Sequence, residues 1–127
     1  MRNIGFITKN KVLAQSLAVR LRESPDLGYE LFLLNKPGQV LLEAEMLKID
    51  LSIIEVTAES HQGHVSTVSL CEGLRRATSG CRIVLLITKA DIVSRDVAVD
   101  AKKRGIVDDF VFTDESLQYL LANLSSL

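Results

Sequence analysis

The strongest constraint on the fold is the way short, uninterrupted apolar runs alternate with stretches of helical periodicity. The run at residues 82–88, RIVLLIT, is the clearest, with five consecutive large aliphatic residues. A run this short and this apolar is typical of a strand buried on both faces, as in a parallel sheet covered by helices on both sides. Similar runs at 4–7, 31–34, 49–56 and 110–112 predict four more strands.

The segments between these runs carry helical signals. In residues 10–24, Leu13, Leu17 and Leu21 are spaced four apart and share one helical face. Asn10 can cap the start of this helix. Further helices are predicted within 39–48, 65–77, 89–105 and 116–124. This order predicts a five-stranded parallel sheet of the doubly wound, flavodoxin-like type, with strand order 2-1-3-4-5 and helices on both faces.

Length and composition limit the classes of protein to which this chain can belong. The 127 residues predict a single domain, spanning residues 1–127. A hydrophobic share of 47% excludes a disordered chain. A formal net charge of −1 argues against bulk attraction to nucleic acid or to an anionic membrane. No apolar run is long enough to span a bilayer, and the first residues lack a signal-peptide pattern, so we expect a cytoplasmic protein.

Candidate site residues can be read from the ends of the predicted strands. In a doubly wound sheet, ligands bind beyond the carboxyl ends of the strands, near the point where the strand order reverses. Chemistry is therefore expected from the residues that directly follow the strands, chiefly Thr8, Lys9, Glu55, Thr88 and Thr113.

Several motifs match one known family. The segment DLSIIE at 50–55 resembles a D-L-x-x-x-D strand, and Gly63 follows Glu55 by eight residues. Thr88 ends the fourth predicted strand, and GIVDDF at 105–110 is similar to a G-A-D-D-Y stretch with one extra residue. Together with the five β-α units, these features resemble the receiver domain of bacterial two-component response regulators over essentially the full chain. The resemblance makes Glu55 the phosphoacceptor position, Thr88 the switch hydroxyl and Phe110 the switch aromatic residue.

The departures from this family are as informative as the matches. The resemblance implies two acids that bind Mg²⁺ after the first strand, but Thr8 and Lys9 stand there. Neither can replace a carboxylate on a hard cation. The phosphoacceptor aspartate is replaced by Glu55. The lysine expected after the fifth strand is replaced by Thr113 or, in an alternative register, by Phe112.

These departures remove the groups on which phosphoryl transfer depends, namely the metal and a neutralising cation. We therefore interpret the chain as a receiver-like signalling module that is not an enzyme and has no catalytic, metal or cofactor site. It is expected to act through a protein partner or a neighbouring effector domain. Glu55 either imitates a phosphorylated acceptor or is merely tolerated, and Lys9 is a candidate ion-pair partner for it.

Two alternatives remain: a true response regulator switched at Glu55, and a small-ligand or nucleotide binder. The segment 8–11 has no glycine-rich phosphate turn, which counts against the second alternative. The sequence TKAD at 88–91 matches a guanine-binding motif, but no phosphate-binding loop accompanies it. His61 and His64 with Cys71 are too few and too loosely spaced for zinc.

The surface offers a further prediction. The resemblance implies that partners or a second copy bind the face formed by the fourth helix, the fifth strand and the fifth helix. After Arg104 there is no basic residue, and this face carries Asp108, Asp109, Asp114 and Glu115. The pattern predicts a basic, salt-sensitive partner and argues against a charge-paired homodimer. The basic residues at the helix ends, Arg75–Arg76 and Lys102–Arg104, are expected to be solvated caps.

Overall fold

The computed structural model describes residues 2–8, 10–23, 28–34, 38–56, 67–78, 80–88 and 90–112. The predicted helix at 116–124 and the segment that contains Gly63 and both histidines lie outside these residues. The elements are β1 (Arg2–Ile7), α1 (Lys11–Arg22), β2 (Tyr29–Leu33), α2 (Val40–Met46), β3 (Leu51–Glu55), α3 (Thr67–Ala77), β4 (Arg82–Ile87), α4 (Ile92–Lys103) and β5 (Asp109–Phe112).

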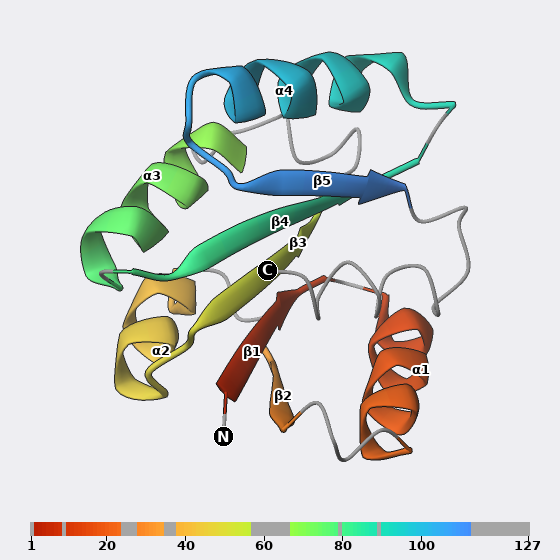
Figure 1. Cartoon of the computed structure of the whole chain (residues 1–127), viewed down its shortest axis with the longest axis vertical. Helices are drawn as coiled ribbons and strands as arrows, with labels where there is room; N and C mark the ends of the chain where they lie inside the picture. Colours follow the sequence, from red (N-terminus) through yellow and green to blue (C-terminus); the bar gives the residue numbers. More distant parts are fainter. Residues whose placement is uncertain are drawn as a thin grey trace.

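The strands form one parallel sheet in the order β2-β1-β3-β4-β5 (Figure 1). β1 pairs with both β2 and β3, so the order reverses beside it. The predicted doubly wound sheet is therefore confirmed. Among the described helices, none is long and apolar enough to cross a membrane.

Helices cover both faces of the sheet, with α1 on one face and α2, α3 and α4 on the other (Figure 1). β4 shows why its sequence is apolar throughout. Ile83, Leu85 and Ile87 point into the cluster under α2, α3 and α4. Val84 and Leu86 alternate with them and join the cluster under α1. Both faces of the strand are buried, which removes the usual alternation of apolar and polar residues.

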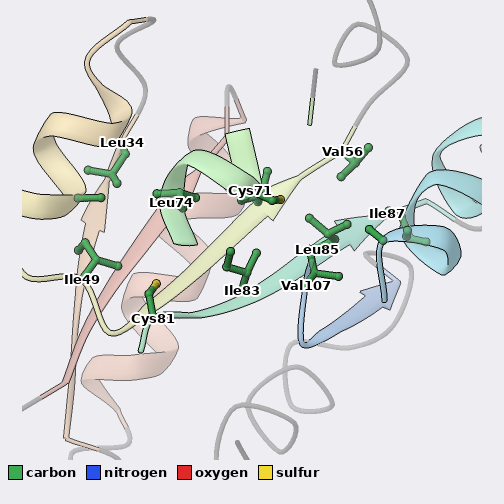
Figure 2. Close-up of a cluster of buried hydrophobic side chains, with 14 residues drawn as sticks. Leu34, Ile49, Val56, Cys71, Leu74, Cys81, Ile83, Leu85, Ile87 and Val107 are labelled. Atoms are coloured by element: carbon green, nitrogen blue, oxygen red, sulfur yellow. The ribbon is translucent and has the colours of Figure 1, made fainter. Parts of the chain in front are cut away.

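The larger cluster contains both cysteines (Figure 2). Cys71 comes from the middle of α3 and is 1% exposed, and Cys81 precedes β4 and is 2% exposed. Both are free thiols. Cys81 lies at the amino end of β4, away from the carboxyl ends of the strands.

The helix ends follow local rules. The side chain of Asn10 accepts a hydrogen bond from Leu13 N at 3.1 Å and caps α1, as predicted. After α4, Gly105 adopts a φ of 74°, which a residue without a side chain tolerates and which stops the helix. The Asn10 cap positions the turn from β1 into α1, which carries Thr8.

Candidate functional site

The structure brings together two of the predicted site residues, Thr8 and Glu55. β1 and β3 are neighbours in the sheet, and Ile7 pairs with Ile54, so the next residue of each strand lies at the same level. The Thr8 hydroxyl donates a hydrogen bond to Glu55 Oε1 at 3.0 Å. Thr8 is buried and Glu55 is half-buried. The carboxylate is thus held from the first strand by a neutral hydroxyl.

A second hydrogen bond fixes the direction of the first. Asn10 N donates to Thr8 Oγ1 at 2.9 Å. A threonine hydroxyl has one proton, and with a lone pair taken by Asn10 that proton points to Glu55. Asn10 also caps α1 through its own side chain. The turn from β1 into α1 is therefore tied to the end of β3 by a continuous chain of hydrogen bonds.

The other predicted site residues that the structure describes belong to β4 and β5 and not to β1 and β3. Thr88 directly follows β4 and is exposed, and Phe110 lies in β5 opposite Leu85. Phe112 lies within β5 opposite Ile87, so the residue after that strand is at position 113. Lys9 and Thr113 lie outside the described residues, and the proposed ion pair between Lys9 and Glu55 stays a prediction.

Asp91, which completes the TKAD sequence, caps α4. Its Oδ1 accepts from Ser94 N at 3.0 Å, and its Oδ2 accepts from the Ser94 hydroxyl at 2.6 Å. Asp91 N in turn donates to Thr88 O at 3.0 Å. The carboxylate occupies the positive end of the helix, where an anion would otherwise bind. The motif match is therefore explained by helix capping.

The residues at this edge do not fit the Mg²⁺ that the family resemblance implies. A hard cation takes oxygen ligands, and the resemblance implies two carboxylates after β1 to hold this one. Glu55, the last residue of β3, is the only carboxylate at the carboxyl end of β1 or β3 within the described residues, and the Thr8 proton is directed at it. Asp50 begins the same DLSIIE segment, but its Oδ2 accepts from Asn3 N at 2.8 Å at the opposite end of β1.

Across the described ranges, no group of three or more His, Cys, Asp or Glu side chains is placed to hold a metal ion.

The expectation that Arg75 is a solvated helix cap is wrong. Its Nε donates to Ile106 O at 3.0 Å, and its Nη2 lies 3.0 Å from Asp108 Oδ2. A longer contact of 3.5 Å reaches Cys81 O. Asp108 Oδ2 also accepts from Ile83 N at 2.8 Å. Arg75 and Asp108 thus join α3, the start of β4 and the turn before β5.

Two of the four acids of the predicted acidic face are paired with basic side chains. Asp108 pairs with Arg75, and Asp109 lies 3.0 Å from Lys102 Nζ. The other two predicted acids lie outside the described residues. The exposed surface of α4 carries three aliphatic residues, with 66% exposure of Ile92, 59% of Val93 and 38% of Val99. They lie among exposed charged residues, namely Arg95, Asp96, Asp100, Lys102 and Lys103.

We expect Cys71 to resist alkylation in the folded protein. Burial raises the pKa of its thiol to about 12, and the nearby Arg75 offsets this only in part. Because the thiolate is the nucleophile, iodoacetamide at pH 8 should modify Cys71 at least about 100-fold more slowly in the native state than in urea. Peptide mass spectrometry measures both rates, and rapid native labelling of Cys71 would contradict the buried position.

The same thiol contributes to the pH dependence of folding. The unfolded thiol ionises near its ordinary pKa of 9.0, whereas the folded thiol ionises near 12. Proton loss between these values favours the unfolded state, so this contribution to stability is present below pH 9 and is lost as the pH rises toward 12.

No protein-family model and no curated protein sequence matches this chain. Solved structures do match. A two-component response regulator from Clostridium difficile is 22% identical with a TM-score of 0.76, covering 99% of this chain and 94% of that one. The chemotaxis protein CheY4 of Vibrio cholerae is 16% identical with a TM-score of 0.74, covering 99% and 98%.

A response regulator protein from Burkholderia pseudomallei is 26% identical with a TM-score of 0.72. This chain has the receiver-domain fold. The match covers 96% of this chain but only 65% of the Burkholderia protein, which was solved with a phosphorylated aspartic acid, calcium ion and citrate. The receiver fold places Thr8, Glu55 and Thr88 at the carboxyl-terminal edge of its sheet.

Proposed function

We propose that this chain is a cytoplasmic receiver-like signalling module of a two-component-type system. It acts through contacts with a protein partner or a neighbouring effector domain. It is not an enzyme, and Mg²⁺-dependent aspartyl phosphorylation does not switch it. The hydrogen bond from Thr8 to Glu55 carries this proposal, because it places a hydroxyl and a single glutamate where a receiver needs acids and a metal.

The charges at this edge support the proposal. A phosphoryl group brings nearly two negative charges and needs cations to stabilise it. The described side chains at the carboxyl ends of the strands include the carboxylate of Glu55 and the neutral hydroxyls of Thr8 and Thr88, and the carboxylate of Asp91 caps α4 in the turn after β4. A dianion placed among them would be repelled by both carboxylates.

The exposed aliphatic side chains of α4, Ile92, Val93 and Val99, support action through protein contacts. Ile92 and Val99 are seven residues apart and lie on one side of the helix. Because Asp108 and Asp109 are already paired, we now expect association through α4 and β5 to depend weakly on salt. A second copy could also bind here through apolar contacts, without the charge pairs of the usual homodimer.

An amide NMR titration with Mg²⁺ and then with beryllofluoride tests the proposal. We expect no saturable shift of the Thr8, Glu55 or Thr88 amides at millimolar Mg²⁺. A Thr8→Asp variant is the matched control, because it adds a second carboxylate opposite Glu55 and should gain weak Mg²⁺ binding. Saturable shifts in the unaltered protein, spreading to Phe110, would instead support the alternative of a response regulator switched at Glu55.

A small phosphodonor separates the two possibilities by chemistry. The alternative predicts Mg²⁺-dependent labelling that Glu55→Gln abolishes, whereas the proposal predicts no labelling of either protein. A thermal shift with FMN or a guanine nucleotide would favour the ligand-binding alternative.

A further inference from the structure

The side chain of Phe110 is held from two sides. The Lys102 ammonium lies 5.7 Å from the centroid of its ring, within the range of a cation–π contact. The Phe112 ring meets it edge-on, with the centroids 6.0 Å apart and the planes at 81°. This T-shaped geometry is favourable for two aromatic rings. Phe110 is half-buried, so these contacts act on a ring that solvent partly reaches.

One carboxylate oxygen organises this arrangement. Asp109 Oδ1 accepts from Phe110 N at 2.8 Å and lies 3.0 Å from Lys102 Nζ. The same atom therefore holds the backbone of Phe110 and draws the Lys102 ammonium from the last turn of α4 toward β5. Lys102 has two attractive partners, and both belong to adjacent residues of β5.

We propose that Lys102 is a positioning residue that holds the Phe110 ring against Phe112 and so keeps the face formed by α4 and β5 in one conformation. A change of rotamer at Phe110 would break both ring contacts at once. Lys102 would keep only its ion pair with Asp109. The conformation of the face formed by α4 and β5 would then not depend on a ligand or a modification at the carboxyl-terminal edge of the sheet.

This inference rests on the proposed function, because it names how a module that phosphorylation does not switch keeps its contact face defined. It concerns the aromatic position that the family resemblance assigned to switching. The ring contacts come from α4 and β5 themselves, so they do not depend on Thr8 or Glu55.

NMR of the protein labelled with ¹³C on the phenylalanine rings tests the proposal. Lys102→Met keeps most of the side-chain length and removes the charge. We expect the population of the displaced Phe110 ring to rise about 2- to 5-fold, with a matching loss of the nuclear Overhauser contact to Phe112. Lys102→Arg keeps a cation that can stack on the ring and should restore both signals.

Lys103→Met is the matched control, because Lys103 is exposed on the next position of α4 and has no ring contact within the described residues. It should leave the Phe110 signals unchanged. Unchanged Phe110 signals in Lys102→Met would overturn the proposal, as would a Phe110 ring already divided between two rotamers in the unaltered protein.

The experiment is done without Mg²⁺ or a phosphodonor, which separates the two proposals. If Lys102→Met has no effect, the positioning role fails while the proposed function stands. If beryllofluoride shifts the unaltered protein, the proposed function fails whatever the Lys102 variants show.

Discussion

Replacing Asp108 with alanine is expected to lower the free energy of unfolding by about 3 kcal/mol, with a fall in Tm of about 10 °C. The single oxygen Oδ2 accepts from Ile83 N at 2.8 Å and from Arg75 Nη2 at 3.0 Å. Ile83 is fully buried, so its amide would lose its partner away from water, at a cost of about 1–3 kcal/mol.

The ion pair adds less than the buried amide. The side chains of Arg75 and Asp108 are 35% and 27% exposed, so solvent screens their attraction, and we assign it about 1 kcal/mol. The Asp108→Asn variant keeps an oxygen for the Ile83 amide and loses the charge, so it should recover most of the stability.

The adjacent Asp109 provides the matched control. Its ion pair with Lys102 involves side chains that are 35% and 49% exposed, and Asp109→Ala should cost about 1 kcal/mol or less. Urea unfolding followed by circular dichroism measures all three variants, with the m-value as a check on two-state behaviour. Equal losses for the Asp108 and Asp109 alanine variants would show that the Ile83 hydrogen bond contributes little.

Two glycine-to-alanine substitutions are expected to act in opposite directions. A Cβ on Gly5 would lie 2.9 Å from Leu34 Cδ1 and 3.3 Å from Ile49 Cγ2. Both neighbours are buried core residues that cannot move away without displacing others. We expect Gly5→Ala to cost about 2 kcal/mol through overpacking of the core beside β1.

Gly73 has an equally close neighbour but a different environment. A Cβ there would lie 2.9 Å from Leu41 Cδ1, which is the free end of a side chain that is 39% exposed. Leu41 can swing outward, and alanine is a better helix former than glycine by about 1 kcal/mol. Gly73→Ala in α3 should therefore raise stability by about 0.5 kcal/mol. Thermal unfolding measures the stability of both variants. A large loss of stability in Gly73→Ala would show that Leu41 cannot move outward.

The sheet was predictable chiefly because β3 and β4 are buried on both faces, which produces short uninterrupted apolar runs, whereas the edge strands β2 and β5 are only partly buried. The run predicted at 110–112 is β5 at Asp109–Phe112, and the helix predicted within 39–48 is α2 at Val40–Met46. The strand order followed from a general rule for such sheets. Patterns within short segments of the sequence thus predicted most of the architecture.

The errors concern contacts between residues far apart in the sequence. Arg75 was assigned to solvent because a basic residue suits the end of a helix, yet its ion-pair partner Asp108 lies 33 residues further on. The same pair, with Lys102 and Asp109, removes much of the negative charge that the sequence predicts for that face. Residue counts along the chain cannot show which charges neutralise one another.

The candidate site was predictable in position but not in bonding. Thr8 and Glu55 were identified because each lies at the end of a strand, and Lys9, the candidate ion-pair partner of Glu55, lies outside the described residues. The structure shows Thr8 bonded to the carboxylate. Because Ile7 pairs with Ile54, Thr8 and Glu55 lie next to each other. The register between β1 and β3 is therefore the information that the sequence did not provide.

The position of Thr8 and Glu55 within the sheet also bears on where the molecule can move. β1 and β3 each have a hydrogen-bonded strand on both sides, whereas β2 and β5 are the edges. In native-state hydrogen exchange, central strands generally open only with the whole domain, while edges and loops open more readily. The backbone beneath the candidate site should therefore be among the slowest to exchange. Any local opening through which this domain responds to a partner would then arise at an edge, and at the β5 edge α4 carries the exposed side chains of Ile92, Val93 and Val99.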